Sequence, residues 1–378
     1  MNIAFVIPTL GPGGAERVAS LLCNFWAAQG HAVSLVTFEA PSSEPFHDIQ
    51  DKVAIYRLNA CNSTCGVASF TRTNVRRIVR LRRVFRRLHP DVIIAFMTEA
   101  NVIALCAAQG LGVPIVISER NQPDRPGFGR AHRFARRMTY GRADALVVQT
   151  TQIGAWAKAR FQIPVFVVAN PVSPKKKGAE TTRFKPENEK QLMSIGRLTH
   201  QKGYDILIKS FSALAEQHPR WGLRIYGEGP ERACLEELIK GSGLEGRIQL
   251  PGLRRDAAAA LAEASVFVLP SRYEGYPNAL IEALAYGLPV IATDCPGANA
   301  EILANGDYGM LVPVDDVAAL TAALHSMMSA PNLRAAYSLR AREAVANLDL
   351  GIIGRRWLEL FGEVIMQRKA EARSGRKP

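Results

Sequence analysis

Short, uniformly apolar runs alternate with longer segments of helical periodicity along most of the chain. Continuous apolar runs of this length are typical of parallel strands that are buried on both faces. In the first half the predicted strands are 3–8, 32–37, 54–58, 92–96, 115–118, 145–149 and 165–168. In the second half they are 191–196, 223–226, 247–250, 266–270, 290–293 and 310–312. The alternation predicts an α/β protein with two Rossmann-like parallel sheets.

The length of 378 residues favours two domains. The strand pattern places the N-terminal domain at 1–172 and the C-terminal domain at 191–353, joined by a polar, charged linker at 173–190. A last helix is predicted at 354–370, because its apolar residues recur on one face. The polar residues beyond this helix are expected to fray.

Composition describes a globular protein with an ample core, since 48% of the residues are hydrophobic and the mean hydropathy is close to zero. No apolar run reaches the roughly 18 residues that a membrane-spanning helix needs. The N-terminus starts with a buried strand pattern and has no basic segment of the kind that begins a signal peptide. Six cysteines are scattered, and the closest pair, Cys61 and Cys65, lacks companions for a zinc site. A reduced, cytoplasmic chain is therefore expected.

The net charge of +13 is concentrated in places. Eight arginines and no acid occur in one segment, at Arg72, Arg76, Arg77, Arg80, Arg82, Arg83, Arg86 and Arg87. Apolar residues recur at helical spacing in the same segment, which predicts a basic amphipathic helix suited to an anionic membrane surface. An ordinary solvated helix face is the alternative. Nucleic acid is not expected as a partner, because no aromatic residues are interleaved with the charge.

One segment combines two carboxylates with a turn and a helix start, Glu274-Gly-Tyr-Pro-Asn-Ala-Leu-Ile-Glu282. It follows a predicted strand, and the pattern from Ala279 onward is helical. The first N–H groups of a helix and its dipole suit a phosphate. Two carboxylates around such an anion site suggest a ligand in which a sugar and a ribose are joined by a diphosphate.

Two further loops follow strands. Arg197 and Lys202 lie in Gly196-Arg-Leu-Thr-His-Gln-Lys-Gly203, and two cations near a helix start suit a diphosphate. Gly13 and Gly14 lie in Gly11-Pro-Gly-Gly-Ala-Glu-Arg17, where glycine lets the backbone approach a ligand closely. A plain helix-starting turn is the alternative for the second loop.

These three motifs, in this order, resemble the retaining glycosyltransferases of family 4, and the resemblance covers nearly the whole chain. It implies the GT-B architecture, in which two Rossmann-like domains face each other across a cleft and a C-terminal helix crosses back to the first domain. In that architecture the N-terminal domain binds the acceptor and the C-terminal domain binds the nucleotide sugar.

The resemblance also assigns roles to residues. Arg197 and Lys202 neutralise the leaving diphosphate, and Glu274 orients the donor sugar. Glu282 holds the ribose hydroxyls. The remaining donor-binding residues are Gly14, Gly252, Leu253, Asn278, Ala279 and Leu280.

The chain departs from the family pattern in one respect, because a histidine that many members carry after the fifth N-terminal strand is missing. Glu119, Arg120 and Asn121 are the candidates for its place as a sugar contact, and Arg120 equally for an acceptor phosphate. Gly13 is a further candidate for contact with the acceptor.

No cofactor or metal is expected. The chain has no Asp-x-Asp in a loop after a strand, and Asp315-Asp316 is predicted to begin a helix as its N-cap. Positive side chains and helix dipoles would take the place of an ion.

The expected reaction moves a hexose or N-acetylhexosamine, with UDP favoured as its carrier, to a hydroxyl of a lipid-linked saccharide. The enzyme would sit at the inner face of the membrane through residues 72–87. Alternatives are a GDP-mannose-dependent mannosyltransferase, an epimerase or phosphorylase of the same fold, and a catalytically silent subunit that only binds sugar nucleotides.

Overall fold

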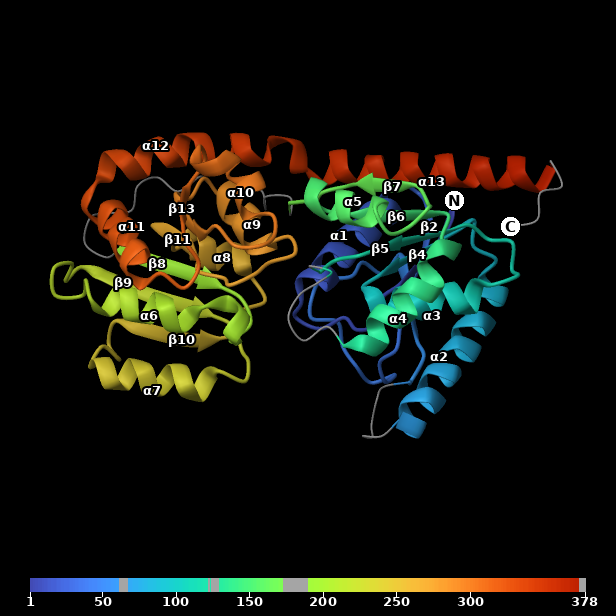
Figure 1. Ribbon diagram of the computed structural model, residues 1–378, viewed down its shortest axis with the longest axis horizontal. Helices are drawn as coiled ribbons and strands as arrows, with labels where there is room; N and C mark the ends of the chain where they lie inside the picture. The colour runs from blue at the N-terminus through green and yellow to red at the C-terminus, as the bar shows by residue number, and fades with distance from the viewer. Residues whose placement is uncertain (61–66, 122, 124–128, 173–189, 374–378) are drawn as a thin grey trace. The chain divides into compact units, whose positions relative to one another are not determined.

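The computed structural model describes residues 1–60, 67–121, 123, 129–172 and 190–373, and for 67–71 and 373 the backbone alone. The chain divides into two compact units (Figure 1). Unit 1 comprises Met1–Pro171 with Leu350–Pro378, and unit 2 comprises Val172–Asp349. Cys61, Cys65 and nearly all of the predicted linker lie outside the described residues.

Unit 1 is built on a parallel sheet with the strand order β3-β2-β1-β4-β5-β6-β7. Its strands are β1 (Asn2–Val6), β2 (Ala32–Thr37), β3 (Val53–Arg57), β4 (Val92–Phe96), β5 (Ile115–Ser118), β6 (Ala145–Val148) and β7 (Val165–Val167). The central strands β1, β4, β5 and β6 are almost wholly buried, as their uniformly apolar sequences require.

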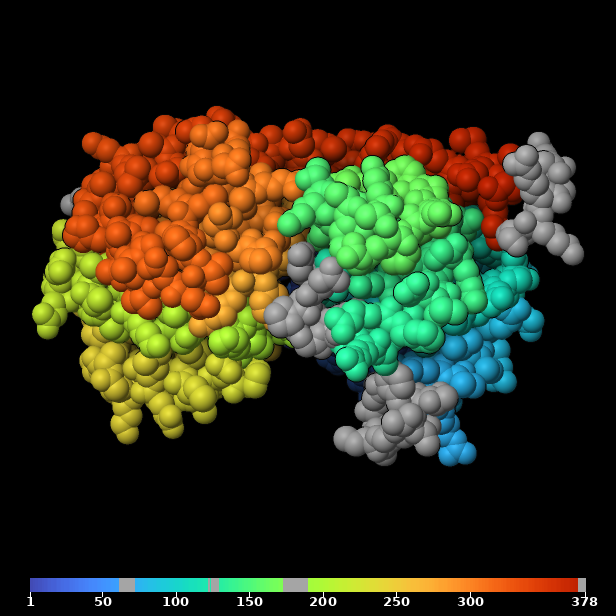
Figure 2. All heavy atoms as spheres, in the orientation of Figure 1, coloured from blue at the N-terminus to red at the C-terminus, as the bar shows by residue number. Residues whose placement is uncertain are grey.

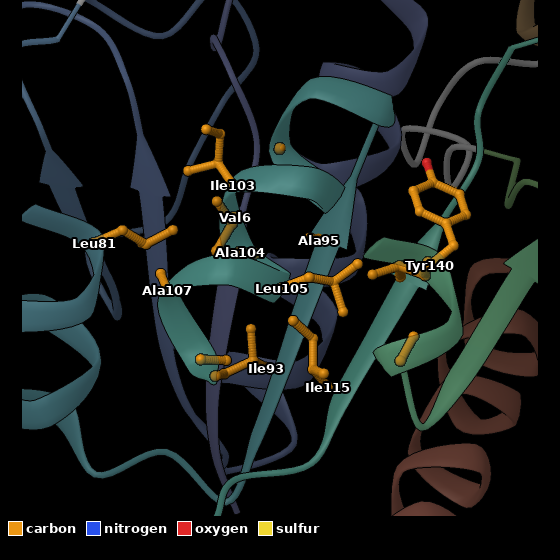
Figure 3. Close-up of a cluster of buried hydrophobic side chains, with 14 of the residues drawn as sticks. Val6, Leu81, Ile93, Ala95, Ile103, Ala104, Leu105, Ala107, Ile115 and Tyr140 are labelled. Atoms are coloured by element: carbon orange, nitrogen blue, oxygen red, sulfur yellow. The ribbon is translucent and has the colours of Figure 1, made fainter. Parts of the chain in front are cut away.

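Helices cover this sheet. They are α1 (Gly14–Ala28), α2 (Val67–Leu88), α3 (Thr98–Ala108), α4 (Arg130–Thr139), α5 (Thr151–Lys158) and α13 (Leu350–Arg373), with a 3₁₀ turn at Tyr140–Arg142. One part of the core forms where Leu81 of α2 and Leu105 of α3 meet Val6, Ile93 and Ile115 from three strands (Figure 3).

Unit 2 repeats the same plan, with the parallel order β10-β9-β8-β11-β12-β13. Its strands are β8 (Lys190–Ile195), β9 (Trp221–Tyr226), β10 (Ile248–Gly252), β11 (Val266–Leu269), β12 (Val290–Thr293) and β13 (Met310–Val312). Its helices are α6 (Tyr204–Ser212), α7 (Arg232–Ser242), α8 (Ala257–Ala262), α9 (Asn278–Ala285), α10 (Asn299–Ile302), α11 (Val317–Ser329) and α12 (Pro331–Ala341), with 3₁₀ turns at His200–Lys202, Ala304–Gly306 and Glu343–Leu348.

The predicted fold class is confirmed, and each predicted strand is present. Several strand boundaries differ from the prediction by one or two residues. Lys190 belongs to β8 and not to the linker, because it pairs with Trp221. Strand β9 begins at Trp221, two residues earlier than predicted. The last helix runs from Leu350 to Arg373, longer than predicted at both ends. The prediction of Asp316 as an N-cap is confirmed, since its carboxylate accepts a hydrogen bond from the Ala319 N–H at 2.8 Å.

Aromatic packing holds α13 onto unit 1. The Trp26 ring of α1 lies 5.3 Å from the Phe361 ring and 6.5 Å from the Trp357 ring, and its Nε1 donates to the Gly354 carbonyl at 3.1 Å. Gly354 allows this approach, because a Cβ there would lie 2.3 Å from a carbon of the Phe25 ring. The first turns of α13 are therefore fitted tightly to α1.

We expect Gly354→Ala to destabilise the protein by about 1–3 kcal/mol, because the added methyl overpacks the contact with Phe25. Gly362→Ala is the matched control on the same helix, where an added Cβ meets nothing within 4 Å. It should stabilise by roughly 0.5–1 kcal/mol, since alanine is the better helix former. Urea unfolding of both variants measures the difference, and equal effects would show that the Phe25 contact is unimportant.

Candidate active site

The candidate site lies at the point in unit 2 where the strand order reverses. Lys202 follows β8 and Glu274 follows β11, and these two strands are neighbours at the centre of the sheet. Ligands of open α/β sheets bind at this switch point, beyond the carboxyl ends of the strands. The Lys202 Nζ lies 2.6 Å from the Glu274 Oε1, in an ion pair whose side chains are 16% and 6% exposed.

Backbone contacts hold the loops of the site together. The Gln201 side chain donates to the Tyr273 carbonyl at 2.9 Å, and the Arg272 N–H donates to the Gln201 carbonyl at 2.7 Å. The Glu274 N–H donates to the Pro296 carbonyl at 2.9 Å in the loop after β12. The loops after β8, β11 and β12 therefore form one connected surface.

Two glycines make this packing possible. Gly203 has a φ of 63°, and a Cβ there would lie 2.1 Å from the Pro270 carbonyl oxygen. Gly297 has a φ of 144°, and a Cβ there would lie 2.4 Å from the Glu274 carbonyl oxygen. Other residues would clash with backbone at both positions, so the loops could not approach one another.

A chain of hydrogen bonds orients the Glu274 carboxylate. The Ser271 hydroxyl donates to Oε1 at 2.6 Å, so this oxygen receives both Ser271 and Lys202. The Thr293 hydroxyl donates to the Ser271 carbonyl at 2.5 Å, and Asn299 donates to the Thr293 carbonyl at 2.9 Å. The other carboxylate oxygen, Oε2, accepts no hydrogen bond from the described residues and is available to a ligand.

Other predicted donor residues lie at the same edge of the sheet. Arg197 is exposed and forms no ion pair within the described parts of the chain. Gly252 ends β10 with a φ of 88°, and Leu253 beyond it is 49% exposed. The residues Asn278, Ala279 and Leu280 form the first turn of α9, and Glu282 lies one turn further, buried.

The sequence did not single out the supporting residues Ser271, Thr293, Cys295 and Asn299. The signal that could have identified them is their position just after, or near, the ends of β11 and β12. The pKa of Cys295 is raised to about 12 by burial and by the nearby Glu274 charge, so its thiol stays protonated.

In unit 1, Glu16 occupies the start of α1. The Thr9 hydroxyl donates to Glu16 Oε1 at 3.0 Å, and a Cβ on Gly13 would lie 2.0 Å from Glu16 Oε2. The carboxylate thus supplies the negative charge that the N-terminal end of a helix favours. Gly13 makes room for Glu16 in this position, and the predicted contact of Gly14 with the donor phosphate stays a prediction.

Glu119 and Arg120 point into unit 1. Glu119 is 1% exposed and accepts hydrogen bonds from Thr98 at 2.7 Å and from Tyr140 at 2.8 Å. Arg120 is 8% exposed, stacks over the Phe96 ring at 4.1 Å and is hydrogen-bonded to Asn170. Both side chains thus bind groups within unit 1, and the predicted sugar or phosphate contact stays a prediction. Asn121, which is partly exposed, is the one of the three that is open to a ligand.

Two doubly wound sheets in succession, with a lysine–carboxylate pair at the second switch point, define a GT-B enzyme of the kind that uses nucleotide sugars. Residues 13–171 match the family model described as "Glycosyl transferase 4-like domain", and residues 179–344 match the one described as "Glycosyl transferases group 1". The chain belongs to family 4 of the glycosyltransferases, which are retaining enzymes.

Named relatives and solved structures agree with this family. The chain is 28% identical over 96% of its length, and 99% of the relative's, to an α-1,4-N-acetyl-D-galactosaminyltransferase of Campylobacter jejuni named for an undecaprenol-linked acceptor. It is 28% identical over 92% of its length, and 96% of the relative's, to the amylovoran biosynthesis glycosyltransferase AmsD of Erwinia amylovora. Its fold is similar to that of sucrose-phosphate synthase from Thermosynechococcus elongatus, with a TM-score of 0.82 at 19% identity, covering 97% of this chain and 99% of the other. Anabaena HepE, solved with UDP, gives a TM-score of 0.75 at 18% identity, covering 96% and 100%.

Within the described ranges, no three His, Cys, Asp or Glu side chains come together as a metal-ligand set. None of the helices in the described part of the chain is both long enough and apolar enough to cross a bilayer.

We expect Lys202→Met to destabilise the protein by about 3–5 kcal/mol, because it leaves the buried Glu274 carboxylate without its cation. The double variant Lys202→Met/Glu274→Gln removes both charges and should recover most of that loss. Denaturant unfolding of the singles and the double completes a mutant cycle. Additive effects would show that the two groups do not interact in solution.

His47 gives a pH prediction. It lies 3.3 Å from the Gly13 carbonyl, and burial together with the Arg17 charge lowers its pKa from the usual 6.5 to about 4. Between these values the unfolded chain binds a proton that the folded protein does not, so stability falls as pH falls through this window. The stability advantage over His47→Gln should therefore shrink from pH 7 to pH 5, measured by urea unfolding. An advantage that is the same at both pH values would contradict the burial of a neutral imidazole.

Proposed function

We propose that the enzyme transfers an N-acetylhexosamine or hexose from a UDP-sugar to a hydroxyl of a lipid-linked saccharide. The observation that carries this proposal is the Lys202–Glu274 pair at the switch point of unit 2. A cation for a diphosphate and a carboxylate for a sugar lie side by side there, as a nucleotide sugar requires. Unit 2 would bind the donor and unit 1 the acceptor.

The donor is proposed to lie along the carboxyl edge of the unit 2 sheet. The base would contact Gly252 and Leu253, and the ribose hydroxyls would bind Glu282. The diphosphate would meet the first N–H groups of α9, at Asn278, together with the cations described below. The exposed Leu253 just after β10 supports this placement of the base.

Leaving-group stabilisation is proposed to come from Arg197 and Lys202. Both cations follow β8, and the exposed Arg197 has no acidic partner among the described residues. Such preorganised charges stabilise a diphosphate as its bond to the sugar breaks. They would do the work that a divalent metal does in other transferases, so the reaction is proposed to proceed without one.

Retention of configuration follows if the acceptor hydroxyl attacks from the face that the diphosphate leaves. The departing phosphate oxygen would take the hydroxyl proton, so no protein nucleophile is needed. The Glu274 oxygen that accepts no hydrogen bond from the described chain would orient a sugar hydroxyl. This scheme differs from retaining hydrolases, which use two carboxyl groups about 5 Å apart and a covalent intermediate.

The relatives favour UDP and a lipid-linked acceptor. The Campylobacter jejuni relatives are named for N-acetylgalactosamine transfer to undecaprenol-linked glycans, and HepE was solved with UDP. A GDP-mannose donor is the alternative within the same chemistry. A silent sugar-nucleotide-binding subunit is the alternative in another class, and the complete set of Arg197, Lys202, Glu274 and Glu282 argues against it.

A position at the inner membrane face is proposed through α2. Five of its arginines are exposed, at Arg72, Arg76, Arg83, Arg86 and Arg87. The others serve the fold: Arg77 donates to the Ala60 carbonyl and pairs with Glu99, while Arg82 donates to the carbonyls of Ala107 and Gln109. The exposed set is available to anionic headgroups.

The test is a screen of UDP-, GDP- and ADP-sugars for release of the nucleoside diphosphate, with and without a chelator. We expect chelator-resistant release from a UDP-sugar. Arg197→Gln should lower this turnover by about 10²–10³-fold without loss of stability, because the exposed side chain stabilises only the leaving group. Arg220→Gln, an exposed arginine before the amino end of β9, is the matched control and should keep full activity.

Release from a GDP-sugar alone would establish the mannosyltransferase alternative. Tight binding with no release, even with a membrane lipid extract as acceptor, would support the silent subunit. Neither binding nor release for any nucleotide sugar would refute the proposed function.

A further inference from the structure

Unit 1 has an open hollow of about 410 Å³ between the carboxyl end of β3 and the helix α2. It is lined by Arg57, Leu58, Asn59, Arg80, Arg83 and Val84. Three guanidinium groups therefore share one hollow, and no carboxylate is among the described residues that line it. Like charges at one site repel unless an anion joins them, so the composition of the lining points to an anionic ligand.

The three arginines are held differently. Arg80 is fixed in place, because its Nη1 donates to the Leu58 carbonyl at 2.5 Å and to the Asn59 carbonyl at 2.8 Å. The Arg57 Nε is buried and has no hydrogen-bond partner among the described residues. Arg83 is exposed and makes no ion pair within the described residues. A buried N–H without a partner is unfavourable, so the Arg57 side chain gains if it turns toward an acceptor such as a phosphate oxygen.

The hollow adjoins an outward face of α2 that combines charge with exposed apolar side chains. Val75 is 54% exposed and Val79 is 43% exposed. Val79 and Arg83 are four residues apart, so they are neighbours on the helix. Figure 2 shows α2, in light blue, at the surface of unit 1. Apolar side chains among arginines suit the boundary between lipid headgroups and acyl chains.

We propose that Arg57, Arg80 and Arg83 bind the phosphate group of an anionic lipid headgroup, with Val75 and Val79 entering the headgroup layer beside it. This inference rests on the proposed membrane position and gives it a defined site. The lining contains no aromatic ring on which a nucleotide base could stack, and Leu58 and Val84 offer apolar surface to the glycerol part of a lipid. The site reaches beyond the exposed face of α2, because Arg57 comes from the sheet.

That difference separates the site from simple attraction between a basic helix and a charged surface. Diffuse attraction depends on exposed charge, so the half-buried Arg57 would contribute less than the exposed Arg76. A phosphate held in the hollow makes Arg57 at least as important as Arg76. The two arginines are therefore the informative pair.

The experiment is co-sedimentation of the full-length chain with phosphatidylcholine vesicles, with and without phosphatidylglycerol. The variants are Arg57→Gln, Arg83→Gln and Arg76→Gln, and the control is Arg355→Gln, an exposed residue of α13. Each of Arg57→Gln and Arg83→Gln should weaken binding to the anionic vesicles about five-fold, since one basic residue near such a surface is worth about 1 kcal/mol. The control should bind as the unchanged protein does.

A second arm follows thermal unfolding in inorganic phosphate and in sodium chloride of equal ionic strength. The proposal expects phosphate to stabilise the unchanged protein more than the Arg57→Gln variant. Normal vesicle binding by Arg57→Gln would overturn the lipid proposal. This holds even if the variant loses the stabilisation by phosphate, because the site would then bind free phosphate and not a lipid headgroup. The exposed Arg83 provides a variant whose folding is not at risk.

Neither arm contains a nucleotide sugar. Failure here would leave the transferase reaction intact, and failure of the donor screen would leave the vesicle result intact.

Discussion

The candidate site depends on the close approach of backbone to backbone at the carboxyl edge of the unit 2 sheet. Glycine at positions 203 and 297 brings the loop after β8 and the loop after β12 against the loop after β11. Only with these loops in contact can Lys202 reach Glu274, which lies 72 residues away in sequence. The charges of the site are thus placed by the steric freedom of residues that carry no side chain.

The two units share one order over six strands, to which unit 1 adds β7, but they use their edges differently. In unit 2 the loops after the strands present an exposed cation and a carboxylate oxygen open to a ligand. In unit 1 the carboxylates near the equivalent edge are committed to the chain itself, Glu16 to the start of α1 and Glu119 to Tyr140 and Thr98. Burial and the Glu119 charge raise the pKa of Tyr140 well above its usual value, so its hydroxyl remains a donor. A common topology therefore supports a charged site in one unit and a self-contained one in the other.

Much of the fold could be predicted from the sequence, because parallel strands buried on both faces leave unmistakable apolar runs. The loops of the unit 2 site could be found for the same reason, since each follows such a run. Whether a given charged side chain is exposed or buried could not be predicted from the sequence. Arg76 and Arg77 are adjacent in one basic run, yet Arg77 is 4% exposed and bonded to a carbonyl, and Arg76 is exposed. Likewise Glu119 and Glu274 both follow a strand, Glu274 at the greater distance. Packing, and not its position in the sequence, buries Glu119 inside unit 1.

Lys202 and Glu274 neutralise each other in the structure. In the proposed reaction the diphosphate draws Lys202 toward itself. The Glu274 carboxylate then loses its positive partner. The sugar carbon acquires positive charge at the stage of the reaction when its bond to phosphate lengthens. Each member of the pair would thus exchange its counterion once, Lys202 for the leaving diphosphate and Glu274 for the positively charged sugar. A free sugar without a diphosphate could not begin this exchange, so the pair would open only to a ligand that carries a diphosphate.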